Sequence, residues 1–255
     1  MKNILILSKV ETFEAAKNLK LIWLTVFFTI LGVTQPLIDR YMETILQNFG
    51  GVDGIMLDPN TPEPQSNEVL LATFSGQFNQ IGLIVLIISF MGMITAEKNS
   101  GVLGFIFTRP VSNFEYIISK LLSNWIISMI CISIGAVVSY LYTVYLFNDY
   151  SITNFLVYLF FYSIWILCVV SITVLLSAFI NSSIFVAVTT IVISIILMLL
   201  AGINDKLTFF LPSSSLTLAE NQLIEGANSS IMMLIAPILF ITINLLIATS
   251  LIRKF

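Results

Sequence analysis

The 255-residue sequence contains no histidine. Histidine is the usual metal ligand, the usual base of a catalytic triad and the usual proton shuttle near neutral pH. Its absence excludes the histidine-based forms of these sites. The two cysteines, Cys131 and Cys168, both lie inside apolar runs. Two such thiols make neither a disulfide framework nor a ligand cluster, so we interpret them as small packing residues.

Charge is also scarce, at 10% of residues, whereas soluble domains carry about 25%. Hydrophobic residues make up 58%, which is more than one compact core requires and is typical of contact with lipid. The net charge of −3 argues against nucleic acid as a partner, because binding a polyanion needs a basic patch. No glycine is followed by lysine, so the phosphate-binding GxxxxGK[ST] loop is absent and this chain is not expected to hydrolyse ATP by that chemistry.

Long apolar runs dominate what is present. A helix that crosses a bilayer needs about 20 apolar residues, and lipid-exposed irregular backbone is not tolerated there. Six runs qualify, at 19–38, 77–96, 117–147, 153–180, 184–203 and 230–252. The predicted fold class is therefore all-α: one polytopic membrane domain, residues 1–255, with six transmembrane helices.

The positive charges predict the orientation. With six spans, both termini, the segment 97–116 and the turn 180–183 share one side of the membrane. That side carries nine of the eleven basic residues, whereas the other side carries only Arg40 and Lys206. Positive residues are retained in the cytoplasm, so we expect both termini to be cytoplasmic. The nine are Lys2, Lys9, Lys17, Lys20, Lys98, Arg109, Lys120, Arg253 and Lys254.

Three segments lie outside the predicted spans. Residues 1–18 have apolar residues at helical spacing and predict an interfacial helix, or alternatively a plain extension of the first span. Residues 39–76 predict a long outer loop that contains three prolines, with helix resuming near its end. Residues 204–229 are partly apolar and predict short interfacial or re-entrant helices on the outer side.

The segment between the second and third spans carries most information. The second span ends near Glu97, and Asn99-Ser100-Gly101 predicts a break, since Asn and Gly tolerate the left-handed backbone of a helix end. The apolar stretch 102–107 is too short to cross a membrane. An apolar turn in the cytoplasm needs cover, either from lipid headgroups or from a protein partner. After Pro110, Ser112 and Glu115 predict a capping box at the start of the third span.

This segment resembles the coupling region of the type-2 ABC exporter permeases, which are membrane subunits of bacterial transporters. The matching residues are Glu97, Ser100-Gly101, Pro110-Val111-Ser112 and Lys120, in the family's order and at the corresponding place in the topology. The family commonly has threonine after the glycine, where this chain has Val102. The outer loop, with Gln35-Pro36 and its prolines, is similar to a Gram-positive subgroup.

The resemblance implies a bacterial cell-membrane protein that is not itself an enzyme. Residues 98–110 would form a coupling helix that docks on a separate cytoplasmic ATPase subunit, and ATP and magnesium would bind there. A second permease chain, identical or a sibling, would complete the route for a drug, peptide or lipid. The residues implied in coupling are Glu97, Lys98, Asn99, Ser100, Gly101, Val102, Leu103, Phe105, Arg109 and Pro110.

Polar residues inside the predicted spans are few, and no Asp, Glu, Lys or Arg lies near the middle of any span. The strongest polar candidates are Asn79, Gln80, Asn124 and Asn244. They are candidates for a substrate route. The alternative role is interhelical hydrogen bonding, which contributes about 1 kcal/mol each.

Other functions stay open. An ion-coupled secondary carrier would need charges near the midplane or inverted repeats, and the sequence shows neither. An intramembrane enzyme would need catalytic residues that are missing here. A non-transporting immunity or sensor protein would share the same fold, because a fold does not determine a function.

Overall fold

The computed structural model describes residues 2–49, 64–226 and 231–252. These residues are helical with short connections, and no strand occurs among them. The first half of the chain forms α1 (Lys2–Lys17), α2 (Lys20–Phe49), α3 (Ser66–Leu71), the π-helix η1 (Ala72–Gly82), α4 (Leu83–Phe90), α5 (Thr95–Asn99) and α6 (Val102–Ile106). The second half forms α7 (Asn113–Leu146), α8 (Ile152–Phe179), α9 (Ser183–Ala201), α10 (Asp205–Thr208), α11 (Ser214–Glu225), the 3₁₀-helix η2 (Ile231–Leu234) and α12 (Ile235–Ile252).

Six helical stretches of the described chain are long and apolar enough to cross a membrane. They are Lys20–Met42, Ser66–Asn99, Asn113–Leu146, Ile152–Phe179, Ser183–Ala201 and Ile231–Ile252. The chain is therefore an all-helical polytopic membrane protein, as the apolar runs predicted.

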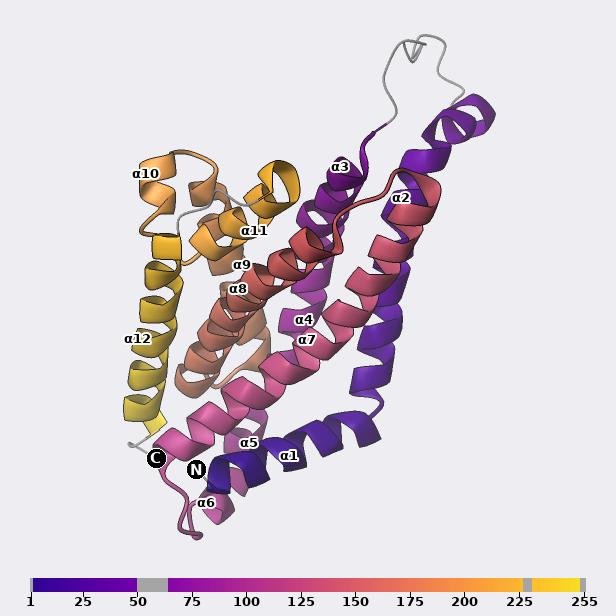
Figure 1. Cartoon of the computed structure of the whole chain (residues 1–255). Helices are drawn as coiled ribbons and strands as arrows, with labels where there is room; N and C mark the ends of the chain where they lie inside the picture. Colours follow the sequence, from indigo (N-terminus) through magenta and orange to yellow (C-terminus); the bar gives the residue numbers. More distant parts are fainter. Residues whose placement is uncertain (1, 50–63, 227–230, 253–255) are drawn as a thin grey trace.

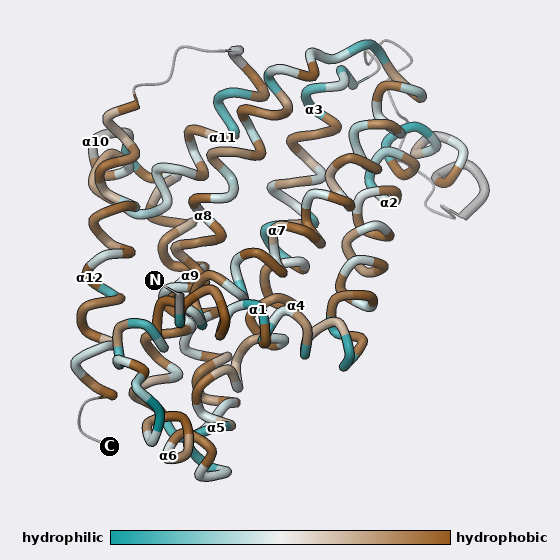
Figure 2. Tube along the Cα trace, turned by 60° about the horizontal axis from the view of Figure 1, so that its bottom comes forward, coloured by the Kyte–Doolittle hydropathy of each residue, from teal (hydrophilic) through white to brown (hydrophobic). Residues whose placement is uncertain are grey.

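The two ends of the bundle differ in what covers them (Figure 1). We call the end with α1, α5, α6 and both termini the basal end, and the opposite end, with α3, α10 and α11, the distal end. At this basal end, α1 lies across the ends of the long helices. Hydrophobic residues run along the long helices, whereas hydrophilic residues gather near α6 and at the distal ends (Figure 2).

The α2 and α7 helices pack closely because two glycines meet between them. A Cβ atom on Gly32 would overlap the backbone carbonyl oxygen of Gly135. A Cβ atom on Gly135 would lie 2.5 Å from the carbonyl oxygen of Phe28. Small residues allow such backbone approach between helices in a membrane. This contact holds α7 against the first span.

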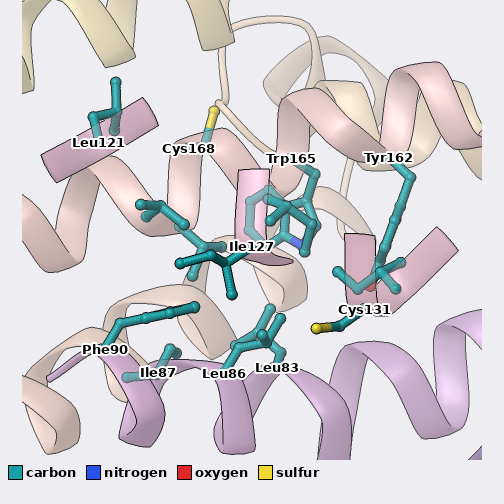
Figure 3. Close-up of a cluster of buried hydrophobic side chains, with 14 of the residues drawn as sticks. Leu83, Leu86, Ile87, Phe90, Leu121, Ile127, Cys131, Tyr162, Trp165 and Cys168 are labelled. Atoms are coloured by element: carbon teal, nitrogen blue, oxygen red, sulfur yellow. The ribbon is translucent and has the colours of Figure 1, made fainter. Parts of the chain in front are cut away.

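The core is centred on α8 and is lined by α4 and α7 (Figure 3). Side chains from all three helices interlock there, and the two cysteines are buried among them with free thiols. The labelled members are Leu83, Leu86, Ile87, Phe90, Leu121, Ile127, Cys131, Tyr162, Trp165 and Cys168.

The second span is longer than the sequence predicted. Helical structure begins at Ser66 instead of residue 77 and includes η1. The glutamine that opens the predicted span is held across the helices: the Gln77 amide donates to Gln35 Oε1 at 2.9 Å, and Thr34 donates to Gln77 Oε1 at 2.9 Å. Satisfied in this way, a polar side chain does not end a helix in the bundle.

Within the outer segment predicted at 39–76, nearly all the described residues are helical. The α2 helix continues to Phe49, and helix resumes at Ser66. Two prolines of this segment, Pro59 and Pro62, lie outside the described residues, as do Arg253 and Lys254.

The segment 204–229 forms short helices at the distal end, as far as residue 226. Here α11 packs along the distal half of α8 and buries Leu216, Leu218, Ala219 and Leu223. The Tyr150 hydroxyl, which lies just before α8, donates to the carbonyl oxygen of Leu223 at 3.0 Å. This helix therefore covers the distal end of the core.

Candidate functional site

The turn between α5 and α6 is built around Gly101. This residue has φ +76°, in the left-handed region that favours glycine. It ends α5 after Asn99 and allows α6 to start at once in a new direction. On α6, Leu103 is buried, whereas Phe105 is 76% exposed and Val102 is 43% exposed. Val102 and Phe105 thus form an exposed apolar face of α6 at the basal end.

Ser112 and Glu115 form the capping box that the sequence predicted at the start of α7. The Glu115 amide donates to Ser112 Oγ at 3.2 Å, and the Ser112 amide donates to Glu115 Oε2 at 3.2 Å. The Asn3 side chain of α1 donates to this carboxylate and to the carbonyl oxygen of Pro110, each at 3.2 Å. The start of α1 is therefore bonded to the segment that connects α6 to α7.

A side chain of α8 accepts hydrogen bonds from the backbone at a break in the second span. The helix is interrupted between α4 and α5, which leaves backbone amides without helical partners. The amides of Ile94 and Thr95 both donate to Ser177 Oγ of α8 at 3.1 Å. The Thr95 hydroxyl also lies 2.8 Å from Ser183 Oγ at the start of α9. These bonds anchor α5 to the turn between α8 and α9.

A groove with a volume of about 830 Å³ lies beside α6 at the basal end. The α5–α6 turn forms one wall, and the turn between α8 and α9 forms another. Asn99 bridges the two walls, because its side chain donates to the carbonyl oxygen of Asn181 at 3.0 Å. The lining residues are Lys98, Asn99, Gly101, Leu103, Gly104, Phe107, Thr108, Val111, Asn113, Asn181 and Ile252.

Next to this turn, a buried lysine forms ion pairs with two carboxylates. Lys120 of α7 is 5% exposed, and its ammonium forms ion pairs with Glu11 of α1 and, at 2.5 Å, with Glu97 of α5. The Tyr116 hydroxyl donates to Glu97 Oε2 at 2.5 Å, and the Ser123 hydroxyl donates to Glu11 Oε2 at 2.7 Å. We call these five residues the Lys120 cluster. A buried charge is tolerated when it is paired and hydrogen-bonded in this way.

Sequence reasoning found only part of this cluster. The resemblance singled out Glu97 and Lys120, but it did not indicate that they contact each other. Tyr116 and Ser123 lie four residues before and three residues after Lys120, so they share its helix face, and this spacing was the available signal. No pattern in the sequence indicated that Glu11 joins them.

The residues predicted for coupling are contiguous at the basal end, but they have two different surroundings. Ser100, Gly101, Arg109 and Pro110 are exposed, together with Val102 and Phe105. In contrast, Glu97 points into the Lys120 cluster. Lys98 donates to the carbonyl oxygen of Ala178 at 3.2 Å, next to the groove.

The four polar residues predicted inside the spans have different surroundings. Asn79 is buried in η1, and Gln80 is exposed. The Asn124 amide donates to the carbonyl oxygen of Lys120 at 2.7 Å, within α7. The Asn244 amide of α12 donates to Ser171 Oγ of α8 at 3.0 Å, which is interhelical bonding.

The distal end contains a titratable group that the sequence did not single out. Glu220 lies on α11, close to Tyr158 and Tyr162 of α8. Burial raises the pKa of the Glu220 carboxyl to about 7. The hydroxyls of Tyr158 and Tyr162 are buried without a hydrogen-bond partner among the described residues.

Comparisons with known proteins agree with this architecture. The model of a family described as ABC-2 family transporter proteins matches residues 5–253. A transmembrane protein of Bacillus subtilis (strain 168), named YxlG and described as uncharacterized, is 36% identical over 172 residues. The match covers 67% of this chain and 66% of that relative.

Proposed function

Because this chain belongs to the ABC-2 family of transporter proteins, in which it is a membrane permease subunit, we propose that it exports cargo with energy from a separate ATPase. ATP and magnesium bind that partner subunit, and this chain contributes no catalytic residue. The observation that carries the proposal is the exposed apolar face of α6 beside a groove of about 830 Å³. A protein partner that covers α6 would remove this face from water.

The charge distribution supports the side on which such a partner binds. The segments that carry nine of the eleven basic residues include α1, the α5–α6 turn and the start of α7, all at the basal end. Basic residues stay in the cytoplasm. The basal end therefore faces the cytoplasm of a bacterial cell, where an ATPase subunit reaches α6, and both termini lie on that side.

A second permease chain, identical or a sibling, completes the transporter. The first, fifth and sixth spans are the least buried in the isolated chain, so their apolar faces are available to lipid and to that second chain. The route between the chains suits an amphipathic or apolar cargo such as a drug, peptide or lipid. Gln80 is the exposed one of the four polar residues in the spans and is the first to test for contact with cargo.

The test replaces Phe105 with aspartate. The change leaves the bundle core intact, because this side chain is 76% exposed, but it places a charge on the docking face. We expect Phe105→Asp to lose co-purification with an ATPase subunit from native membranes and to lose ATP-dependent efflux. The matched control is Phe210→Asp, which alters a side chain that is 78% exposed at the distal end. That control should retain both properties.

Two alternatives predict other results. An ion-coupled carrier would transport in liposomes that contain only this chain and a proton gradient. A non-transporting immunity or sensor protein has the same fold, and efflux would then be absent even with an ATPase bound. Retention of ATPase binding and efflux in Phe105→Asp would contradict docking at α6.

A further inference from the structure

We infer that Lys120 is a positioning residue that joins α1 and the α5–α6 turn to α7, so that the three move as one lever when α6 is pushed. The inference rests on the proposed function, because it concerns how a force on α6 reaches the spans. Its contacts are internal to this chain, so the mechanical unit is testable without an ATPase.

The α1 helix is attached to α7 at two places. Near its start, Asn3 donates to Glu115, and in its second half, Glu11 accepts from Ser123 and pairs with Lys120. Glu11 lies eight positions after Asn3, and Ser123 lies eight positions after Glu115. Eight helical residues span about 12 Å, so the two helices match in spacing and run side by side in the same direction. This arrangement is visible in Figure 1.

The link between α1 and α2 consists of residues 18 and 19. It is a short turn in which Leu19 has φ +56°, a left-handed conformation that is uncommon for a residue other than glycine. Much of the apolar surface of α1 faces outward, with Leu5 71%, Val10 58% and Phe13 62% exposed. The polar contacts with α7 therefore add to the packing of the inner face of α1, where Ser8 and Ala15 are buried.

Lys120 also binds α5, through its ion pair with Glu97. Glu97 lies in the last helical turn before Gly101, and it accepts from both Lys120 and Tyr116. A displacement of α6 moves α5 and with it Glu97. Because Glu97 is paired with Lys120, the displacement is transmitted to α7, and through the second ion pair of Lys120 to Glu11 on α1. Separating either carboxylate from Lys120 removes one of the two ion pairs of a buried ammonium, which is unfavourable. Movement as one body avoids that cost.

The first experiment measures hydrogen–deuterium exchange of the full chain in nanodiscs. Glu11→Gln alters α1 alone, yet we expect faster exchange at 95–106 as well as at 2–17, by about tenfold, which corresponds to the loss of a bond to a charged group. The control Lys9→Met removes an exposed charge from the same helix and should leave 95–106 unchanged. Faster exchange confined to α1 would overturn the inference.

The second experiment removes all three charges together, with Glu11→Gln, Glu97→Gln and Lys120→Met. Replacing a complete buried ion cluster by neutral groups is often tolerated by the fold. In complex with its ATPase, this triple variant should hydrolyse ATP at the wild-type rate but export at least about tenfold more slowly. The ATPase still docks on α6, but the weakened attachment of α1 and α5 to α7 transmits less of the movement to the spans. Export at the wild-type rate would show that the cluster only stabilises the fold.

The two proposals fail differently. If no ATPase binds the wild-type chain, the proposed function is wrong, but the exchange data still show whether α1 and the α5–α6 turn respond together. If the ATPase binds and the triple variant exports normally, the proposed function stands and the role of Lys120 is wrong.

Discussion

The basal and distal ends of the bundle hold their helices in opposite ways. At the basal end, α1 and α5 are attached to α7 through ion pairs and hydrogen bonds that converge on Lys120. At the distal end, α11 covers α8 with apolar side chains, and the partly buried Glu220 has no ion pair among the described residues. Charge-assisted bonds are directional and keep elements in one geometry, whereas apolar packing is not directional. The difference indicates that directional bonds fix the geometry of the basal end, whereas apolar burial holds the distal cover.

Lys120→Met should have the largest effect on stability. The change leaves the partly buried carboxylates of Glu11 and Glu97 without their cation, which costs about 3 kcal/mol, the lower end of the range for breaking a buried pair. The matched control at the distal end is Asp149→Asn, which removes an exposed charge and should change stability little. Thermal unfolding in detergent, followed by fluorescence, measures both. Equal stability of the two variants would remove the contrast between the ends.

The distal end should respond to pH through Glu220. Its carboxyl has a pKa of about 7 when folded and near 4.5 when unfolded, so between these values the folded state binds more protons. Stability therefore falls as the pH rises from about 4.5 to about 7, by about 3 kcal/mol in total. Below this window, protonation of Glu220 in both states leaves no further change from this group.

Glu220→Gln should abolish that part of the pH dependence, with thermal unfolding at pH 5 and pH 8 as the measurement. The Asp149→Asn variant again serves as the control, because its carboxylate is exposed at the same end. A variant that keeps the full wild-type slope would mean that other groups cause the dependence.

Two buried tyrosines, one near each end, allow the two ends to be compared with the same substitution, and the expected effects on stability are the smallest of this series. Tyr116→Phe removes a bond to Glu97 and should cost about 1.5–3 kcal/mol, the range for hydrogen bonds to charged groups. Tyr162→Phe removes a hydroxyl without a partner among the described residues and should be neutral or stabilise by up to about 1 kcal/mol. Chemical denaturation of each variant in the same detergent would reveal the difference, and a reversed order would contradict it.

Much of the architecture was predictable from the sequence, because each span is a local apolar run. The break at Gly101 and the capping box at Ser112 and Glu115 were also predictable, since the residues that form them are neighbours. The start of the second span was not. Its polar opening looked like a loop, yet Gln77 is satisfied by residues of α2 that lie 42 and 43 positions earlier.

The amino-acid sequence by itself determined the class of protein, its crossings and the apolar turn, since hydropathy and helix signals depend on residues close together in the chain. Only the tertiary structure decided that Glu11 meets Lys120, which lies more than 100 residues later. It also decided that Asn124 bonds within its own helix, whereas Asn244 bonds to a neighbouring helix. A buried charge takes its partner from whichever helix packs against it, and helix packing depends on the shape of the whole bundle.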